Sequence, residues 1–457
     1  MQVLFCEWAL LPEGWTRDVR LDIADDGNIA AIHSGSAAGS LPRAAGPVIP
    51  GMPNLHSHAF QRAMAGAAER GGPAGDSFWT WRELMYGLVA RLSPDQVGAI
   101  AAQLYLELLK NGYTAVAEFH YLHHRPDGGR YDAPAELSHR VVEAAREVGI
   151  AITHLPVLYT QGGFGGAPAE PAQRRFVCDL ETFVRILDEL MARYRGDPQV
   201  RLGIAPHSLR AVDEEALAAA LAALDERDGE APVHIHVAEQ EREVEECRAW
   251  CGARPVARLL DTAEVSARWC LVHATHMDDG ETRRLAASGA VAGLCPTTEA
   301  NLGDGIFPAS AFLAAGGVFG VGSDSQISVS PVEELRWLEY VQRLTQRRRV
   351  VLAATEGGSV GAALYRAALE GGARACGRPI GALEPARRAD LVVLDGAHPA
   401  LVGRHGDALL DAYVFAGNES PVSDVMVGGR WLITRRHHDK EEEILARFRA
   451  AIDALAA

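Results

Sequence analysis

The sequence contains almost no lysine: among its 44 basic residues only Lys110 and Lys440 are lysines, and the others are arginines. Its 60 acidic residues give the 457-residue chain a net charge of -16. Because a nucleic-acid-binding protein needs a basic surface, this charge argues against a nucleic-acid partner. A small anionic substrate would need its own local arginines.

Paired cysteines and long apolar runs are also missing. The seven cysteines are odd in number, widely spread and free of any CxxC pair, which argues against a disulfide framework and favours a reducing cytoplasm. No apolar run reaches the roughly 18 residues that a membrane span needs, and the first residues lack the basic segment that begins a signal peptide. We therefore expect a cytoplasmic protein that has no membrane partner.

Short apolar runs alternate with helical stretches rich in alanine, leucine and arginine between about residues 49 and 375. The eight runs are GPVIPGM, YTAVAEF, IAITHLPVL, RLGIAPH, PVHIHVA, WCLVHA, AVAGLCP and VFGVGSD. Strands that are apolar on both faces and alternate with helices are typical of an α/β protein with a (β/α)8 barrel of the TIM type. A doubly wound open sheet is the alternative, but no GxGxxG motif follows any of these runs.

The two ends of the chain have strand and turn patterns instead. Residues 1–48 contain the hairpin signal DDGN, and residues 376–438 contain PARRADLVVLDG, LLDAYVFAG and VSDVMVGGRWLI, the last with a Gly-Gly turn. The sequence therefore predicts a small β-sheet module built from 1–48 and 376–438. The catalytic barrel is predicted over 49–375 and an amphipathic C-terminal helix over 439–457.

Polar side chains end several of the predicted barrel strands, where barrels of this class carry their chemistry. These residues are His56 and His58 on the first strand, His207 on the fourth, His236 on the fifth, His273 on the sixth and Asp324 on the eighth. Residues i and i+2 of a strand project to the same side, so the histidines of LHSHAF can converge on one point. Imidazoles together with one carboxylate suit a catalytic divalent ion such as Zn²⁺, and Fe²⁺ can share such ligands.

An ion at this position would lower the pKa of bound water from about 15.7 toward about 7, which supplies a nucleophile for hydrolysis. His236 lies nearer the end of its strand than His234, so His236 is the predicted ligand and His234 is expected to pack inside the barrel. Glu239 can shuttle a proton, and His273 can polarise the attacked group. Asp324 can bind the metal or accept a proton from water, and both roles need it ionised.

The stretches LHSHAF, HVAE, LVHATH and VGSDS resemble the signature sites of the amidohydrolase superfamily, in its mononuclear deaminase branch. PGMPNLHSHAFQRAMAG, DSFWTWRELMY, YTAVAEFHY, PHSLRAV and TEANLGDGIFP are similar to the formimidoylglutamate deiminases within it. The resemblance covers nearly the whole chain. It implies hydrolysis of N-formimidoyl-L-glutamate to N-formyl-L-glutamate and ammonia in histidine catabolism, by a homodimer. It also implies one metal per chain, because binuclear members use a modified lysine at the end of strand four and neither lysine lies there.

The same resemblance implies a role for each site residue. The metal ligands are His56, His58, His236 and Asp324; the catalytic residues are Glu239, His273 and Asp324; and the substrate contacts are Gln61, Arg82, Tyr121, His207 and Arg210. The substrate has two carboxylates, which arginine binds in a bidentate manner, and Arg82 and Arg210 are expected in strand-to-helix loops. Gln326 departs from the family, which commonly has histidine there, and CPTTEAN has no serine where the family has one at Pro296 or Thr297. Both departures bear on the exact substrate.

Two other functions are compatible with these residues. A deaminase of a heterocyclic base such as guanine would use the same metal site, and Trp79, Trp81 and Tyr121 can stack on a planar base. A degenerate barrel retained as a binding protein would have lost metal ligands, whereas every expected ligand is present. A dianionic substrate requires arginines, and a heterocyclic base requires aromatic side chains on which it can stack. The sequence offers both, so it leaves the choice between these two substrates open.

Overall fold

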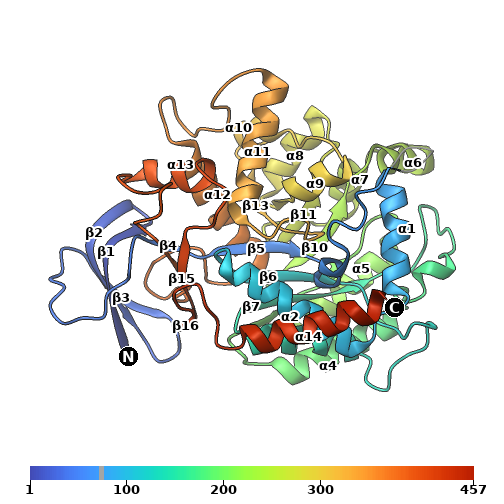
Figure 1. The fold of residues 1–457 in the computed structure, drawn as a ribbon. Helices are drawn as coiled ribbons and strands as arrows, with labels where there is room; N and C mark the ends of the chain where they lie inside the picture. The colour runs from blue at the N-terminus through green and yellow to red at the C-terminus, as the bar shows by residue number, and fades with distance from the viewer. Residues whose placement is uncertain (72–76, 457) are drawn as a thin grey trace.

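The computed structural model describes residues 1–71 and 77–456 of the chain. An α/β body contains the predicted site, and a sheet built from both ends of the chain lies beside it, at the left in Figure 1. None of the helices in the described ranges combines the length and the hydropathy of a membrane span.

Parallel strands form the centre of the body, in two sheets of order β5-β6-β7-β8, with β9 paired to β7, and β10-β11-β12-β13. Their bounds are β5 Met52–Ser57, β6 Tyr113–His120, β7 Ala151–Leu158, β8 Val200–Leu202, β9 Ala205–Pro206, β10 Val233–Val237, β11 Trp269–His273, β12 Val291–Leu294 and β13 Val318–Val321. Nearly all of these strand residues are buried, as parallel strands covered on both faces should be. The predicted α/β class with parallel strands is confirmed.

Isolated bridges connect the two parallel sheets. Ser57, at the end of β5, pairs with Asp324 just after β13, and Ser208, just after β9, pairs with His236 of β10. The Asp324 amide also donates to the His56 carbonyl at 3.0 Å. The carboxyl ends of β5, β10 and β13 therefore meet at one end of the body, where the predicted site residues lie.

Helices follow most of the strands and cover the outside of the body (Figure 1). Their bounds are α1 Phe78–Val89, α2 Pro94–Lys110, α3 Glu136–Val148, α4 Leu180–Tyr194, α5 Glu214–Asp228, α6 Glu241–Cys251, α7 Pro255–Thr262, α8 Asp279–Ser288, α9 Pro296–Leu302, α10 Ala309–Ala314, α11 Pro331–Gln346 and α12 Val360–Cys376, with short 3₁₀ helices η1 Ala59–Met64 and η2 Pro171–Gln173. Capping side chains fix the residues at which several of these helices begin. Ser93 and Gln96 form a capping box at the N-terminus of α2, and Asp213 caps the N-terminus of α5.

The sheet beside the body has the order β16-β15-β14-β4-β1-β2-β3. Its strands are β1 Gln2–Leu11, β2 Gly14–Ile23, β3 Ile29–His33, β4 Val48–Pro50, β14 Leu391–Leu394, β15 Val422–Val427 and β16 Arg430–Ile433. DDGN joins the antiparallel β2 and β3, and the Gly-Gly turn joins β15 and β16, as the sequence predicts. The chain ends in α14 (Glu441–Ala456), which packs along α2 and forms an ion pair between Glu441 and Lys110.

Two apolar runs do not form the predicted elements. LLDAYVFAG, predicted as a strand, lies in helix α13 (Asp407–Phe415), which packs against α11 and α12. Leu409, Leu410 and Val414 are all buried, and so uniform an apolar run shows neither a period of two nor one of 3.6. GPVIPGM is divided: β4 pairs with β1 and β14 beside the body, and the parallel sheet begins only at Met52.

Candidate metal centre and substrate pocket

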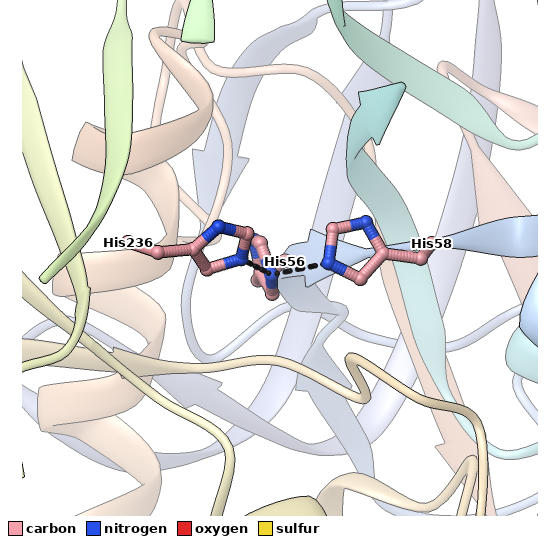
Figure 2. A group of neighbouring side chains, drawn as sticks. All are labelled: His56, His58 and His236. Atoms are coloured by element: carbon pink, nitrogen blue, oxygen red, sulfur yellow. Dashed lines mark hydrogen bonds between the residues drawn. The ribbon is translucent and has the colours of Figure 1, made fainter. Parts of the chain in front are cut away.

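Three buried imidazoles converge at the carboxyl ends of β5 and β10 (Figure 2). His56 Nε2 lies 3.2 Å from His58 Nε2 and 3.0 Å from His236 Nε2. Asp324 Oδ1 lies 3.5 Å from His56 Nε2 and 3.3 Å from His58 Nε2. The fold therefore brings all four predicted metal ligands together, although they come from three separate parts of the chain.

These donor atoms have the spacing and the chemistry that a divalent ion requires. Ligand atoms about 2.0–2.1 Å from a tetrahedral metal lie roughly 3.3 Å from one another, close to the separations seen here. His58 Nδ1 donates to the Phe119 carbonyl at 2.8 Å, so its Nε2 carries a lone pair that faces the other rings. Burial lowers the pKa of His58 to about 3, which keeps the imidazole in its neutral, ligating form.

The turn after β13 directs Asp324 toward the histidines. Asp324 and Gln326 have φ angles of 43° and 64°, in a region that residues other than glycine rarely adopt. The side-chain amide nitrogen of Gln326 donates to the Asp324 carbonyl at 2.6 Å and to Ser57 Oγ at 3.1 Å. The side-chain oxygen of Gln326 accepts a hydrogen bond from Ser323 Oγ at 2.7 Å. Gln326 is fully buried. Its contacts therefore support the turn that carries Asp324.

Glu239 and His273 lie beside this group of ligands. His273 Nε2 is 3.7 Å from Glu239 Oε1 and 3.7 Å from Asp324 Oδ2, and its Nδ1 is 3.3 Å from Glu299 Oε1. Burial alone would lower the pKa of His273, but the surrounding carboxylates, that of Glu239 above all, raise it to about 10. Burial raises the pKa of Glu239 to about 7. The arrangement can thus hold an imidazolium donor next to a carboxyl group whose affinity for a proton is raised by burial.

A pocket opens over the candidate metal ligands, and all five predicted substrate contacts line it. Gln61 donates to the Tyr121 hydroxyl at 2.8 Å, and the Tyr121 ring lies edge-on to His58 with 4.9 Å between centroids. His207 packs against the ring of Tyr159 with 4.7 Å between centroids. Aromatic side chains from separate segments, Trp81, Tyr86, Tyr159 and Phe176, supply much of the remaining wall.

Two arginines bring positive charge into the same pocket. Arg82 lies within helix α1 and not in a loop as predicted, because Ser77 caps a helix that begins directly after it. Its guanidinium lies over the rings of Trp79 and Tyr86, 4.7 Å and 5.4 Å from their centroids. Arg210 lies in the turn after β9, as expected. Within the described residues, the Nε atoms of both arginines have no hydrogen-bond partner.

Three buried carboxylates near Glu239 are absent from the sequence-based prediction. Glu243 accepts the backbone N–H of Glu239 at 3.3 Å, Glu299 contacts the neighbouring imidazole, and Asp304 accepts a hydrogen bond from the Gln240 side chain. All three are at most 5% exposed. Acidic residues are rarely buried unless they are paired, so nothing in the local sequence marks them as interior. Glu243 and Glu299 lie within about five residues of a predicted strand end, whereas Asp304 lacks even this signal.

The comparisons with known proteins identify the family. The model of the amidohydrolase family matches residues 48–432, and the model of the formimidoylglutamate deiminase HutF N-terminal domain matches residues 1–43. The chain is 56% identical to the formimidoylglutamate deiminase of Pseudomonas aeruginosa, over 97% of both chains, and 29% identical to the 8-oxoguanine deaminase of that organism, over 90% of this chain and 88% of the other. A crystal structure of an amidohydrolase from Brucella melitensis superposes with a TM-score of 0.95 at 48% identity and 100% coverage of both chains. The protein belongs to the amidohydrolase family and, within it, to the formimidoylglutamate deiminases.

Proposed function

We propose that the protein hydrolyses N-formimidoyl-L-glutamate to N-formyl-L-glutamate and ammonia, a step of histidine catabolism. The observation that carries this proposal is a single pocket that joins a histidine and aspartate metal site to two arginines. The substrate has matching parts, a formimino group to be hydrolysed and two carboxylates to be bound. The 56% identity to the enzyme of Pseudomonas aeruginosa supports the same reaction.

One divalent ion, Zn²⁺ with Fe²⁺ as the alternative, is the cofactor that we infer for His56, His58, His236 and Asp324. Bound there, the ion supplies a water molecule that is activated for attack at neutral pH. Three mutually close Nε2 atoms, with the proton of His58 engaged on its other nitrogen, support a cation at their centre. The strand end at His207 has no lysine, which supports one ion and not two.

Glu239 and Asp324 serve as proton acceptors when water attacks the amidine carbon. A new C–O bond forms at this carbon, and Glu239 delivers the proton to the terminal nitrogen. The C–N bond to that nitrogen then breaks, ammonia leaves, and the formyl amide remains. The imidazolium of His273, 3.7 Å from Glu239, stabilises negative charge at the reacting group.

Arg82 and Arg210 bind the carboxylates of the substrate, since guanidinium groups bind carboxylates through paired hydrogen bonds. Their Nε atoms, which have no hydrogen-bond partner within the described residues, supply donors for this purpose. Gln61, Tyr121 and His207 line the same pocket and complete the contacts to the substrate.

The second candidate function is deamination of a heterocyclic base such as guanine. The aromatic wall of Trp81, Tyr86, Tyr159 and Phe176 and the 29% identity to an 8-oxoguanine deaminase favour it. Among the described residues no carboxylate lies within 4.0 Å of the Arg82 guanidinium, and a neutral base would add none, so the dicarboxylate is better supported.

Ammonia release from a small panel tests the choice of substrate. The panel contains N-formimidoyl-L-glutamate, its aspartate analogue, guanine and cytosine. We expect rapid release from the first compound, slower release from the aspartate analogue and none from the bases. Release from guanine, with none from N-formimidoyl-L-glutamate, would contradict the proposed function.

We also infer that the two parallel sheets form one closed (β/α)8 barrel, with residues 1–48 and 376–438 as its accessory module. Bridges from Ser57 to Asp324 and from Ile204 to Val233 support the closure, because they lie at the two seams between the sheets.

For the intact protein we propose a cytoplasmic homodimer. The seven free cysteines are consistent with a reducing compartment. Sedimentation equilibrium tests the dimer, and a monomer at micromolar concentration would contradict it.

A further inference from the structure

Glu243, on helix α6, contacts both functional parts of the pocket. Its Oε1 accepts the backbone N–H of Ala238 at 3.1 Å, and its Oε2 accepts the backbone N–H of Glu239 at 3.3 Å. The same Oε2 lies 3.7 Å from Nε of Arg210. Because Glu243 is only 1% exposed, water does not screen these contacts.

The backbone held by Glu243 has an unusual conformation. Ala238 has a φ of 52°, in the left-handed region that residues with a Cβ rarely adopt. This residue follows the last residue of β10 and turns the chain so that Glu239 lines the pocket. Two hydrogen bonds to one carboxylate offset the cost of this conformation. The direction of the Glu239 side chain therefore depends on Glu243.

Arg210 depends on the same carboxylate for its charge balance. Its side chain is 13% exposed, and among the described residues Glu243 is the one carboxylate within 4.0 Å of it. Burial would lower the pKa of Arg210, but Glu243 and then Glu239 raise it overall. Since the Nε atom has no hydrogen-bond partner among these residues, the guanidinium stays free to bind an incoming carboxylate.

We propose that Glu243 is a positioning residue that fixes the proton shuttle Glu239 and the carboxylate-binding Arg210 relative to each other. The inference rests on the proposed function, because it takes Arg210 as a contact of a substrate carboxylate. It deepens that function by joining substrate capture and proton transfer through one side chain. Loss of Glu243 should therefore change both KM and kcat, whereas a residue that holds one of the two partners would change one parameter.

The variant Glu243→Gln tests this coupling at nearly constant side-chain volume. The single carbonyl oxygen of the glutamine can accept a hydrogen bond from only one of the two backbone N–H groups. The NH₂ group of the glutamine would face the other backbone N–H and the Arg210 guanidinium, which are donors and cannot accept its hydrogen bonds. With N-formimidoyl-L-glutamate we expect kcat to fall and KM to rise, each by roughly tenfold or more. Glu245→Gln is the matched control, because Glu245 is an exposed acid on the same helix; both parameters should stay at wild-type values.

A substrate without carboxylates separates the two contributions. With an N-alkylformamidine, Glu243→Gln should lower kcat as before, through Glu239, but should leave KM unchanged. A double-mutant cycle gives the same information from the protein side. In an Arg210→Gln background, the further change Glu243→Gln should lower kcat and have no further effect on KM for N-formimidoyl-L-glutamate.

Metal analysis and thermal unfolding of each variant separate positioning from folding. The proposal is overturned if Glu243→Gln keeps its metal and its fold and has wild-type kcat and KM, or if its effect on KM is the same with and without Arg210. If Glu243→Gln does not fold, Glu243→Asp replaces it: this variant keeps the charge but shortens its reach, and both parameters must still change. Failure of the wild-type enzyme to release ammonia from N-formimidoyl-L-glutamate would instead contradict the proposed function.

Discussion

The metal side and the carboxylate side of the pocket differ in how the chain holds their side chains. On the metal side the proposed ligands lie at strand ends or in the turn after β13, and two of them have supporting contacts: the Phe119 carbonyl for His58 and the Gln326 side chain for the turn of Asp324. On the carboxylate side, Arg82 belongs to a helix and Arg210 to a turn, and their Nε atoms have no hydrogen-bond partner within the described residues. Under the proposed function, the strand ends would hold the reacting groups, while the arginines of a helix and a turn would bind the carboxylates of the substrate. The two properties should respond separately to mutation.

Loss of a metal ligand should have the largest effect. His236→Ala removes an imidazole whose Nε2 lies 3.0 Å from His56 Nε2. We expect the metal content to fall far below one per chain and turnover to fall by roughly 10³-fold or more, because water without an ion keeps a pKa near 15.7. Elemental analysis and ammonia release measure the two quantities.

His234→Gln is the control on the same strand. His234 bonds to the Ala375 carbonyl at 2.8 Å, a contact that a glutamine amide can also make. This variant should retain its metal. Full metal content and full activity in His236→Ala would show that His236 is not a ligand.

The proton shuttle provides the next largest effect and separates chemistry from metal binding. Glu239→Gln keeps the size of the side chain and removes its ability to accept and deliver a proton. We expect a metal content near one per chain, a nearly unchanged KM and a kcat lower by about 10²- to 10⁴-fold. Metal analysis with steady-state kinetics provides the check, and normal turnover in this variant would refute the shuttle role.

The carboxylate side should respond in a substrate-dependent way. Arg82→Gln removes a guanidinium that lies over the rings of Trp79 and Tyr86. Arg82 belongs to helix α1 and not to a strand end. For N-formimidoyl-L-glutamate we expect kcat/KM to fall by about 10- to 100-fold, the value of a charged hydrogen-bonded contact. The metal content should not change.

The matched measurement for Arg82→Gln uses an N-alkylformamidine, which lacks carboxylates. For this substrate kcat/KM should stay within about twofold of the wild-type value, because the lost contact is one that it never makes. Equal losses with both substrates would mean that Arg82 supports the whole pocket, and the separation of the two sides would then be wrong.

This division also explains which parts of the molecule the sequence predicts. The residues of LHSHAF, HVAE and VGSDS lie at the ends of apolar runs, and the end of each run indicates the end of the strand. The alternation of side chains along a strand then gives the direction of each side chain. Helix α1 was not predicted at Arg82, because its start depends on the Ser77 cap and not on apolar periodicity. LLDAYVFAG predicts a strand as a short apolar run, but it forms a helix whose side chains are buried on nearly every side, so no helical period marks it.

Residues that act through a distant partner were out of reach of the sequence. Glu243 has an unremarkable position in a charged helix, and its role appears only when the fold brings Arg210 beside it. Asp304 is similar, because its burial beside Glu239 depends on the loop after α9. Strand-end chemistry is therefore predictable from local patterns, whereas contacts between loops and helices require the tertiary structure.

The smallest expected effect belongs to Gln326, which tests whether the rigidity of the metal side extends beyond its ligands. Gln326→Ala would remove one buried hydrogen bond from each of the Ser57 hydroxyl, the Ser323 hydroxyl and the Asp324 carbonyl, at a cost of about 1–3 kcal/mol in the free energy of unfolding. Each of the three groups keeps one other partner. Since these contacts hold the turn of Asp324, metal affinity should fall by roughly 10- to 100-fold, as it does when an outer contact of a ligand is lost. KM should not change once metal is saturating. Denaturant unfolding, chelator competition and steady-state kinetics measure the three quantities. A higher KM with unchanged metal affinity would instead assign Gln326 to the substrate side.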